Sequence, residues 1–382
     1  MTKTVVVLRR EILPFSETFV VEQMRHLQHW QAILVGTQRL ENGLGCDDVT
    51  THIIPEHSHL LEKKYLQRLR NYFWLKNPKV SEFLSRLSPD LIHIHFGVDA
   101  VYFWQSITDL NIPILITLHG YDINIYKSWW QAGYGGRVMQ KYPDRLLAIA
   151  QHPNVRFIAV SQAIKQRAID YGIPEDKITV HYIGVDTDKF KPKGLPISMR
   201  ENIIVFVGRF VEKKAPLALI EAFSKVIEQV PDAKLVMVGD GELRAQAEQL
   251  ARHLGLPVVF RGVLSAEEIQ AELDKAKVFC LPSVTAKNGD AEGLPISILE
   301  AISKNIFVVV TKHSGNPDIT DIEKFGCLVH EDSNSELIEA LVKMLKQKDK
   351  IDISQTLSFF ERFDIKNTQK RIETIYQELS NG

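Results

Sequence analysis

The chain has 382 residues, which favours two domains, and its 45% of hydrophobic residues supply apolar surface for two cores. With 46 Lys and Arg against 47 Asp and Glu, the formal net charge is −1, which argues against nucleic-acid binding through a global basic field. Cys46, Cys280 and Cys327 form no C-x-x-C pair, which argues against a zinc knuckle and a disulfide framework. No apolar run approaches the roughly 18–20 residues of a spanning helix, and 5–8 is too short for a signal-peptide core. We therefore expect a cytoplasmic protein, soluble or peripheral at the inner face of the membrane.

Short apolar runs alternate with longer amphipathic stretches along the whole chain. In the first half they predict strands at 5–8, 32–35, 52–54, 91–95, 114–117, 157–160 and 178–182. In the second half they predict strands at 203–207, 234–238, 258–260, 278–281, 307–310 and 327–329. Near-continuous apolar strands separated by helices indicate parallel sheets covered on both faces. The predicted fold class is α/β, with two tandem Rossmann-like doubly wound domains and a ligand-binding cleft between them.

The stretch 190–202 contains Pro, Gly and charged residues without periodicity, which predicts a linker. We therefore expect one domain at 1–190 and a second at 200–362. The segment 363–382 is predicted to be helical, and we expect it to return to the first domain. Its apolar side consists of Ile372, Ile375, Tyr376 and Leu379.

A loop with three cations follows the predicted strand 203–207. Arg209 and Lys214 stand just before a helix that begins near Pro216. A helix N-terminus presents unpaired N–H groups and a partial positive charge, so these residues suit a phosphate or diphosphate. The alternative is a solvated loop without a ligand.

The next glycine-containing loop does not complete a dinucleotide fingerprint. Gly239 and Gly241 match its first two glycines, but Arg244 occupies the place of the third, so NAD binding is not predicted. We expect Gly241 to let the backbone approach a ligand closely.

Two carboxylates flank the start of a third helix. Glu292 lies in the loop before it, and Glu300 lies about five residues inside it, roughly 7.5 Å along the axis. That separation is unlike a catalytic carboxylate dyad and suits hydroxyl-rich groups such as a ribose and a sugar. Free N–H groups around Gly293 and Leu294 lie between them. The alternative is an exposed loop acid and a separate helix-surface acid.

Taken together, these residues resemble the donor site of glycosyltransferase family 4, whose members are retaining transferases with the GT-B fold. The resemblance extends over nearly the whole chain. The Ser-Glu-Thr-Phe and His-Phe-Gly motifs resemble those of bacterial exopolysaccharide enzymes of the colanic-acid type. The resemblance rests on the order of the donor loops and of five first-half motifs: Pro14-Phe-Ser-Glu-Thr-Phe19, His93-Ile-His-Phe-Gly97, Thr117-Leu-His-Gly-Tyr-Asp122, Val160-Ser161 and Ile183-Gly-Val-Asp186.

The resemblance implies roles for these residues. Arg209 and Lys214 bind the donor diphosphate, Glu300 accepts from the ribose hydroxyls, and Glu292 contacts the donor sugar. The implied catalytic residues are His119, Arg209, Lys214 and Glu292. The remaining implied donor-site residues are Gly241, Gly262, Val263, Gly293, Leu294 and Pro295, with Gly262 and Val263 framing the base. The implied acceptor-side residues are Ser16, Glu17, His95 and Asp122.

Two positions depart from the family pattern. Ala215 stands where glycine commonly follows the lysine, and the first strand is not followed by a glycine-rich loop.

The histidines of the first half allow more than one interpretation. His119 ends a predicted strand, and Asp122 is near enough to orient it; a hydrogen-bonded structural histidine is the alternative. His93 and His95 point the same way from one strand, as metal ligands sometimes do. Since no third ligand is evident, packed histidines are favoured, and we predict no metal site.

The expected function is therefore transfer of a sugar from a nucleoside diphosphate, UDP being favoured by the resemblance, to a saccharide acceptor that is lipid-linked. No cofactor and no metal are expected. The stretch 60–80 holds six cations and one acid with interleaved aromatics, which favours contact with anionic lipid; an ordinary amphipathic helix is the alternative. The other functions considered are a catalytically idle nucleotide-sugar-binding partner or sensor, and a sugar-nucleotide epimerase.

Overall fold

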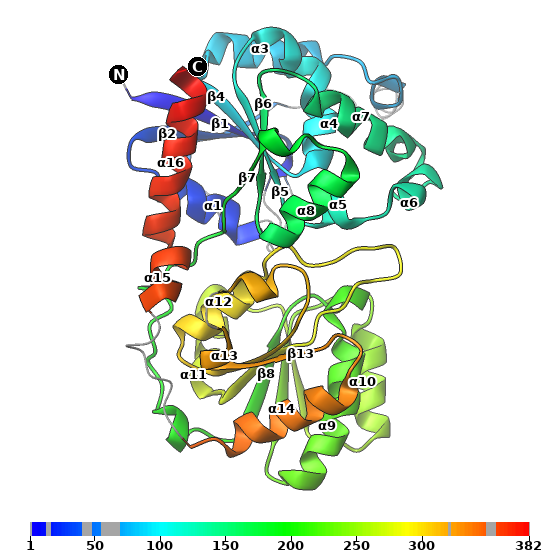
Figure 1. Cartoon of the computed structure of the whole chain (residues 1–382), viewed down its shortest axis with the longest axis vertical. Helices are drawn as coiled ribbons and strands as arrows, with labels where there is room; N and C mark the ends of the chain where they lie inside the picture. Colours follow the sequence, from blue (N-terminus) through cyan, green and yellow to red (C-terminus); the bar gives the residue numbers. More distant parts are fainter. Residues whose placement is uncertain are drawn as a thin grey trace. The chain divides into compact units, whose positions relative to one another are not determined.

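The computed structural model describes residues 2–12, 17–39, 48–54, 69–319, 322–348 and 357–381 of the chain. The chain divides into two compact units, Met1–Gly184 with Ile365–Gly382 (unit 1) and Val185–Asp364 (unit 2). Each unit is built on one parallel sheet with helices packed against it (Figure 1). The predicted α/β fold of two doubly wound domains is confirmed.

Unit 1 contains a seven-stranded sheet in the order β3-β2-β1-β4-β5-β6-β7. Every strand pairs in parallel, so all carboxyl ends lie at one edge. The order of strands reverses between β1 and β4, and such a switch point is where open α/β sheets bind ligands. The strands are β1 (Lys3–Ile12), β2 (Trp30–Arg39), β3 (Thr51–Ile53), β4 (Leu91–His95), β5 (Ile114–Leu118), β6 (Val155–Ala159) and β7 (Ile178–Val180).

The two faces of this sheet carry separate cores because side chains alternate along a strand. In β1, Val6 and Leu8 join the larger core, whereas Val5 and Val7 point to the opposite face. That opposite face is covered partly by α16, the last helix of unit 1, through Ile372 and Tyr376 (Figure 1). The helices of unit 1 are α1 (Thr18–Arg25), α3 (Pro78–Leu87), α4 (Gly97–Ile107), α5 (Tyr121–Asn124), α6 (Lys127–Gln131), α7 (Tyr142–Ala150), α8 (Gln162–Tyr171) and α16 (Ile365–Asn381).

Unit 2 contains a six-stranded parallel sheet in the order β10-β9-β8-β11-β12-β13. The order reverses between β8 and β11, so the loops after these two strands flank the switch point. The strands are β8 (Ile203–Val207), β9 (Lys234–Val238), β10 (Val258–Gly262), β11 (Val278–Leu281), β12 (Phe307–Thr311) and β13 (Gly326–Val329). Each strand predicted from the sequence is therefore present in one of the two sheets.

Local signals set several helix ends in unit 2. Pro216 occupies the first turn of α9, where its missing N–H has no intrahelical role. Ser265 and Glu268 form a reciprocal capping box at the start of α11. The helices are α9 (Pro216–Gln229), α10 (Arg244–His253), α11 (Ala266–Lys275), α12 (Ile296–Ser303), α13 (Ile322–Phe325), α14 (Asn334–Lys346) and α15 (Leu357–Phe363).

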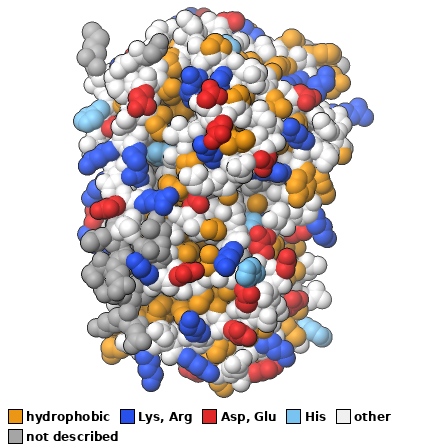
Figure 2. All heavy atoms as spheres, in the orientation of Figure 1, with side chains coloured by type: hydrophobic (Ala, Val, Ile, Leu, Met, Phe, Trp, Pro, Cys, Tyr) orange, Lys and Arg blue, Asp and Glu red, His pale blue; other side chains and the backbone are white. Residues whose placement is uncertain are grey.

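The visible surface carries acidic and basic side chains side by side (Figure 2), in keeping with the formal net charge of −1. Among the described helices, none has the length and apolar character needed to cross a membrane.

Candidate active site

The loop after β8 brings Lys214 to the switch point of unit 2. A short 3-10 helix, Glu212–Lys214, is followed by Ala215 in the left-handed conformation (φ 46°, ψ 47°), and α9 begins at the next residue. Left-handed backbone favours glycine, so alanine here stores of order 1 kcal/mol of strain. The turn between Lys214 and α9 therefore forms with Ala215 at the position where glycine is common.

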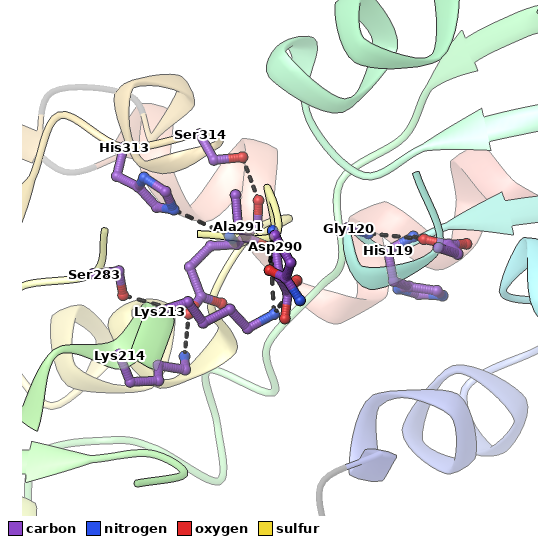
Figure 3. Close-up of polar contacts among 12 residues, drawn as sticks. His119, Gly120, Lys213, Lys214, Ser283, Asp290, Ala291, His313 and Ser314 are labelled. Carbon is purple, nitrogen blue, oxygen red and sulfur yellow. Dashed lines mark hydrogen bonds and ion pairs between the residues drawn. The ribbon is translucent and has the colours of Figure 1, made fainter. Parts of the chain in front are cut away.

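Lys214 forms a nearly buried ion pair with Glu292. The Nζ–Oε1 distance is 2.9 Å, and the two side chains are 12% and 8% exposed (Figure 3). Burial opposes ionisation of Glu292, but Lys214 and Lys213 outweigh it and hold the pKa of this carboxyl at about 2. Burial likewise lowers the pKa of Lys214, against the attraction of Glu292. Because the two loops that carry these residues follow neighbouring strands, the sheet itself brings them together.

Lys213 was not among the predicted site residues, yet it fixes the same pair of loops. Its Nζ lies 2.9 Å from Asp290 Oδ1 and donates to the carbonyl oxygen of Ala291 at 3.3 Å. Its own carbonyl accepts from the Val284 N–H. Two adjacent lysines before a helix were the only signal in the sequence, and nothing local tells which lysine ties the loops and which pairs with Glu292.

Arg209 differs from both lysines because it is exposed. Among the residues that the structure describes, its guanidinium has no hydrogen bond or ion pair. Its charge is nevertheless close enough to contribute to the lowered pKa of Lys214. An exposed guanidinium beside a buried ion pair is available for two-pronged binding of phosphate oxygens.

Glu300 lies inside α12, partly buried, as the spacing predicted. Burial raises the pKa of its carboxyl to about 7, with Lys189 acting in the opposite direction. Pro295 is the N-cap of α12, which begins at Ile296. Leu294 is buried, and Gly293 lies between Glu292 and this cap.

The glycines at the carboxyl ends of β9 and β10 allow close backbone contacts within the protein. A Cβ on Gly239 would lie 2.0 Å from the carbonyl oxygen of Gly208, and one on Gly241 would lie 2.6 Å from that of Phe210. The close approach seen at Gly241 is therefore to Phe210; its approach to a ligand stays a prediction. Gly262 ends β10 and accepts from the Gly239 N–H at 2.7 Å, and Val263 beside it is exposed.

In unit 1, His95 and His119 are hydrogen-bonded to each other. The distance from His95 Nδ1 to His119 Nε2 is 2.9 Å, and the rings stack with centroids 5.2 Å apart. Burial lowers the pKa of both imidazoles well below the usual value. The neutral rings thus share one N–H between them, with one imidazole donating and the other accepting.

Asp122 lies beside His119, as predicted, but among the described residues it makes no hydrogen bond to the imidazole and acts on the backbone. Its carboxylate accepts instead from the backbone N–H groups of Gly97, His119 and Gly120 at 2.8–3.0 Å. Burial raises the pKa of Asp122 to about 6, against these three N–H groups. Asp122 therefore fixes the backbone turn that carries His119 and Gly120, the two residues labelled in Figure 3.

His93 is a packed histidine, as favoured from the sequence. Its Nδ1 lies 2.7 Å from the Tyr376 hydroxyl and its Nε2 lies 2.7 Å from Thr117 Oγ1. Both ring nitrogens are therefore engaged within the sheet and by α16.

The predicted acceptor-side residues Ser16 and Glu17 are only partly described. Ser16 lies outside the described residues. Glu17 pairs with Arg9 at 2.6 Å, and Arg9 also binds Asp99 at 2.9 Å. Burial raises the pKa of Glu17, against the Arg9 guanidinium. The Arg9 cluster was not predicted from the sequence. It joins Arg9 of β1 to Glu17, eight positions further along the chain, and to Asp99, 90 positions further along.

Two family models match adjacent parts of the chain. "Glycosyltransferase Family 4" matches residues 16–189, and "Glycosyl transferases group 1" matches residues 187–355. The putative colanic acid biosynthesis glycosyltransferase WcaL of Escherichia coli (strain K12) is 36% identical over 257 residues, 66% of this chain and 60% of that protein. The amylovoran biosynthesis glycosyltransferase AmsK of Erwinia amylovora is 31% identical over 193 residues, 50% of this chain and 47% of that protein. The chain thus spans between about half and three-fifths of the length of these relatives.

Solved structures resemble the whole chain. A glycosyltransferase from Rickettsia africae has a TM-score of 0.72 at 19% identity, covering 99% of this chain and 98% of that one. Anabaena Alr3699/HepE in complex with UDP-glucose has a TM-score of 0.77 at 18% identity, covering 98% and 99%. At these identities the likeness establishes the fold, which is GT-B.

Proposed function

Because this chain belongs to glycosyltransferase family 4, with its two family models matching residues 16–355 in succession, we propose that it transfers a sugar from a nucleoside diphosphate to a saccharide acceptor in exopolysaccharide synthesis. The observation that carries the proposal is the nearly buried Lys214–Glu292 pair at the switch point of unit 2, beside the guanidinium of Arg209, which has no partner among the described residues. The names of these relatives refer to colanic acid and amylovoran biosynthesis, which supports the exopolysaccharide context.

The donor-side chemistry follows from charge. Breaking the bond between the sugar and the diphosphate leaves a nucleoside diphosphate with growing negative charge. Arg209 and Lys214 are the cations that stabilise this charge, and Lys214 is already held in place by its ion pair. Such electrostatic stabilisation is usually the largest catalytic effect in a site of this kind. Glu292 contacts the donor sugar, Glu300 accepts from the ribose hydroxyls, and the segment Gly262-Val263 frames the base. In this proposal Arg209 and Lys214 supply the positive charge and no metal ion takes part, as the family resemblance implies.

The transfer proceeds with retention at the sugar carbon. The acceptor hydroxyl forms the new bond to that carbon on the face from which the diphosphate departs, and its proton passes to the departing phosphate oxygen. His119 faces the donor sugar in this scheme. UDP is the favoured nucleotide, and the UDP-glucose complex of the structurally similar HepE is consistent with that choice.

Thermal unfolding with UDP, GDP, ADP and their sugar conjugates tests the donor class. A nucleotide at 100 times its Kd is expected to stabilise the protein by about 2.7 kcal/mol, a rise of a few degrees in Tm. The rise should disappear in Arg209→Ala and persist in Arg252→Ala, which removes an exposed arginine from α10. A nucleotide-specific shift without any turnover on acceptor would favour the idle sensor instead, and no shift with any nucleotide would contradict the assignment of Arg209, Lys214 and Glu300.

The role of Glu300 predicts a pH dependence of nucleotide binding. Its pKa of about 7 leaves the carboxyl protonated below neutrality and ionised above it. Only the carboxylate accepts from two ribose hydroxyls, so the affinity of the wild type for UDP should rise as the pH increases. Between pH 6 and pH 8 this rise should be about tenfold larger than the rise measured for Glu300→Gln. Calorimetric titration of both proteins at three pH values measures this difference, and parallel curves would contradict the role.

The acceptor in this proposal is a lipid-linked saccharide, reached from a membrane surface that unit 1 contacts. Of the basic stretch 60–80, residues 69–80 are described. Trp74 turns inward and donates from Nε1 to the Val101 carbonyl, whereas Phe73 and Leu75 are 62% and 60% exposed. Exposed apolar side chains followed by Lys76 suit the boundary between acyl chains and anionic headgroups.

Removing both apolar side chains in Phe73→Ala with Leu75→Ala should lower binding to anionic lipid vesicles at least about tenfold, because each loses burial in the membrane. Sedimentation with vesicles of mixed anionic and neutral lipid measures this. Leu254→Ala, which trims an exposed leucine of unit 2, is the control. If the wild type, the double variant and Leu254→Ala all sediment equally, residues 73–75 are not the membrane contact.

A further inference from the structure

The main chain of Glu292 is held on both sides by two consecutive residues from another loop. Its N–H donates to Nε2 of His313 at 3.1 Å, and its carbonyl oxygen accepts from the Ser314 hydroxyl (Figure 3). His313 and Ser314 follow β12, the strand next to β11 in the sheet. The backbone of Glu292 is thereby fixed independently of its ion pair with Lys214.

These contacts assign the tautomer of His313. An amide N–H only donates, so Nε2 of His313 accepts and carries no proton. The ring proton is on Nδ1, which donates to Glu331 Oε1 at 2.8 Å. His313 is 1% exposed, so water does not compete for either nitrogen.

The same carboxylate closes the arrangement on the loop that carries Glu292. Glu331 Oε2 accepts from the backbone N–H of Thr285 at 2.9 Å and lies 3.3 Å from its hydroxyl. Glu331 thus holds the loop directly at Thr285 and indirectly, through His313, at Glu292. Segments that follow three neighbouring strands, β11, β12 and β13, are tied by one carboxylate.

Ser314 adopts a left-handed backbone conformation with φ 43°. For a residue other than glycine, this conformation costs of order 1 kcal/mol and persists only where the surroundings enforce it. Here the conformation accompanies a hydroxyl that binds the Glu292 carbonyl while the preceding imidazole binds the Glu292 amide. A glycine would adopt this backbone more easily but would lack the hydroxyl.

We propose that His313, backed by Glu331 and assisted by Ser314, is a positioning residue that holds Glu292 in the place where its carboxylate meets the donor sugar. The proposal rests on the proposed function, in which Glu292 contacts that sugar. Arg209 and Glu300 bind the nucleotide and are not held by His313. Loss of His313 should therefore weaken the recognition and transfer of the sugar while binding of the nucleotide alone is retained.

The variant His313→Phe keeps a planar ring of similar size and removes the acceptor for the Glu292 N–H. Its kcat for sugar transfer should fall about a hundredfold, the usual effect of a misplaced reacting group, while the Kd for UDP stays within about twofold. His313→Gln retains an acceptor and a donor and should recover part of the loss. The control is His330→Phe, since His330 is exposed and also bonds a glutamate, Glu336, through Nδ1.

Nitrogen-15 NMR of the histidine side chains gives a readout besides activity. The wild type should show an Nδ1–H tautomer that is absent from His313→Gln and altered in Glu331→Ala, and an Nε2–H tautomer for His313 would overturn the proposal. A folded His313→Phe variant with the kcat of the wild type would also overturn the proposal. A His313→Phe variant in which both the affinity for UDP and the Tm fall would overturn it too. If the wild type itself binds no nucleotide and transfers no sugar, the proposed function fails and this inference falls with it.

Discussion

Replacing Lys214 by alanine is expected to lower kcat/KM for sugar transfer by at least about a hundredfold. Removing one preorganised group that stabilises developing charge typically costs this much, and Lys214 is the cation that lies against Glu292 in the interior of the site. Assays with saturating acceptor and varied nucleotide sugar measure the effect. Lys225→Ala is the matched control, because Lys225 is exposed on α9 and pairs with Glu228.

The same substitution should also reduce stability, because it leaves the Glu292 carboxylate nearly buried without its partner. Breaking a buried ion pair in this way costs about 3–5 kcal/mol. The double variant Lys214→Met with Glu292→Gln removes both charges, so it should regain most of that stability while remaining inactive. Denaturant unfolding separates the two effects. Near-normal turnover in folded Lys214→Ala would contradict the site, and an active double variant would contradict it more directly.

Mild acid should destabilise unit 1 more than unit 2. Burial lowers the pKa of His93 to about 3 and of His181 to about 4, and it lowers those of His95 and His119 well below the usual value. In the unfolded chain these imidazoles take up protons below about pH 6.5. The unfolded state then binds more protons than the folded state, so this stability is present above pH 6.5 and is lost as the pH falls toward 4.

The expected loss is large even after opposing groups are included. Each histidine contributes about 1.4 kcal/mol per pH unit once its unfolded form is protonated. Burial raises the pKa of Asp122 to about 6 and also raises that of Glu17, so these two carboxyls act in the opposite direction. Four histidines against two carboxyls leave a net loss of stability as the pH falls from 6 to 5.

Tryptophan fluorescence measures this loss in unit 1 alone, because Trp30, Trp74, Trp104, Trp129 and Trp130 all lie in that unit. Urea midpoints at pH 7.5, 6.0 and 5.0 should fall steadily. The variant His181→Gln, which removes one of the four imidazoles, should show a shallower dependence. Midpoints that do not change with pH would mean that these histidines bind protons in the folded state.

The strands and the loops that follow them were predictable because each depends on local pattern. A run such as 203–207 is apolar on both faces only because helices cover both, and this single fact fixes a parallel sheet. Once the sheet is assigned, loops after β8 and β11 must meet at one edge, so the proximity of Lys214 and Glu292 follows. Ala215 was recognised as a departure, but its left-handed conformation was visible only in the structure.

The contacts that orient those residues were not predictable, because they join positions with no shared pattern. His313 is a single histidine two residues beyond a buried strand. Its bonds to Glu292 and Glu331 connect the loops that follow β11, β12 and β13. His95 and His119 lie 24 positions apart, and nothing in that spacing indicates a bond between their rings. Asp122 was correctly placed near His119, but a carboxylate binds N–H groups of the backbone as readily as an imidazole, and the sequence does not distinguish the two.

The place of α16 also bears on how the protein is made. Its Tyr376 bonds His93 at the centre of the first sheet, and its Glu373 accepts from the backbone N–H groups of Gln28 and His29. All of Val185–Asp364 is synthesised between the sheet of unit 1 and this helix. Unit 2 is contiguous and free to fold as it leaves the ribosome, whereas unit 1 emerges first and is completed last. Until α16 emerges, the apolar face that awaits Ile372 and Tyr376 is uncovered, so unit 1 is more exposed to aggregation than unit 2 during synthesis.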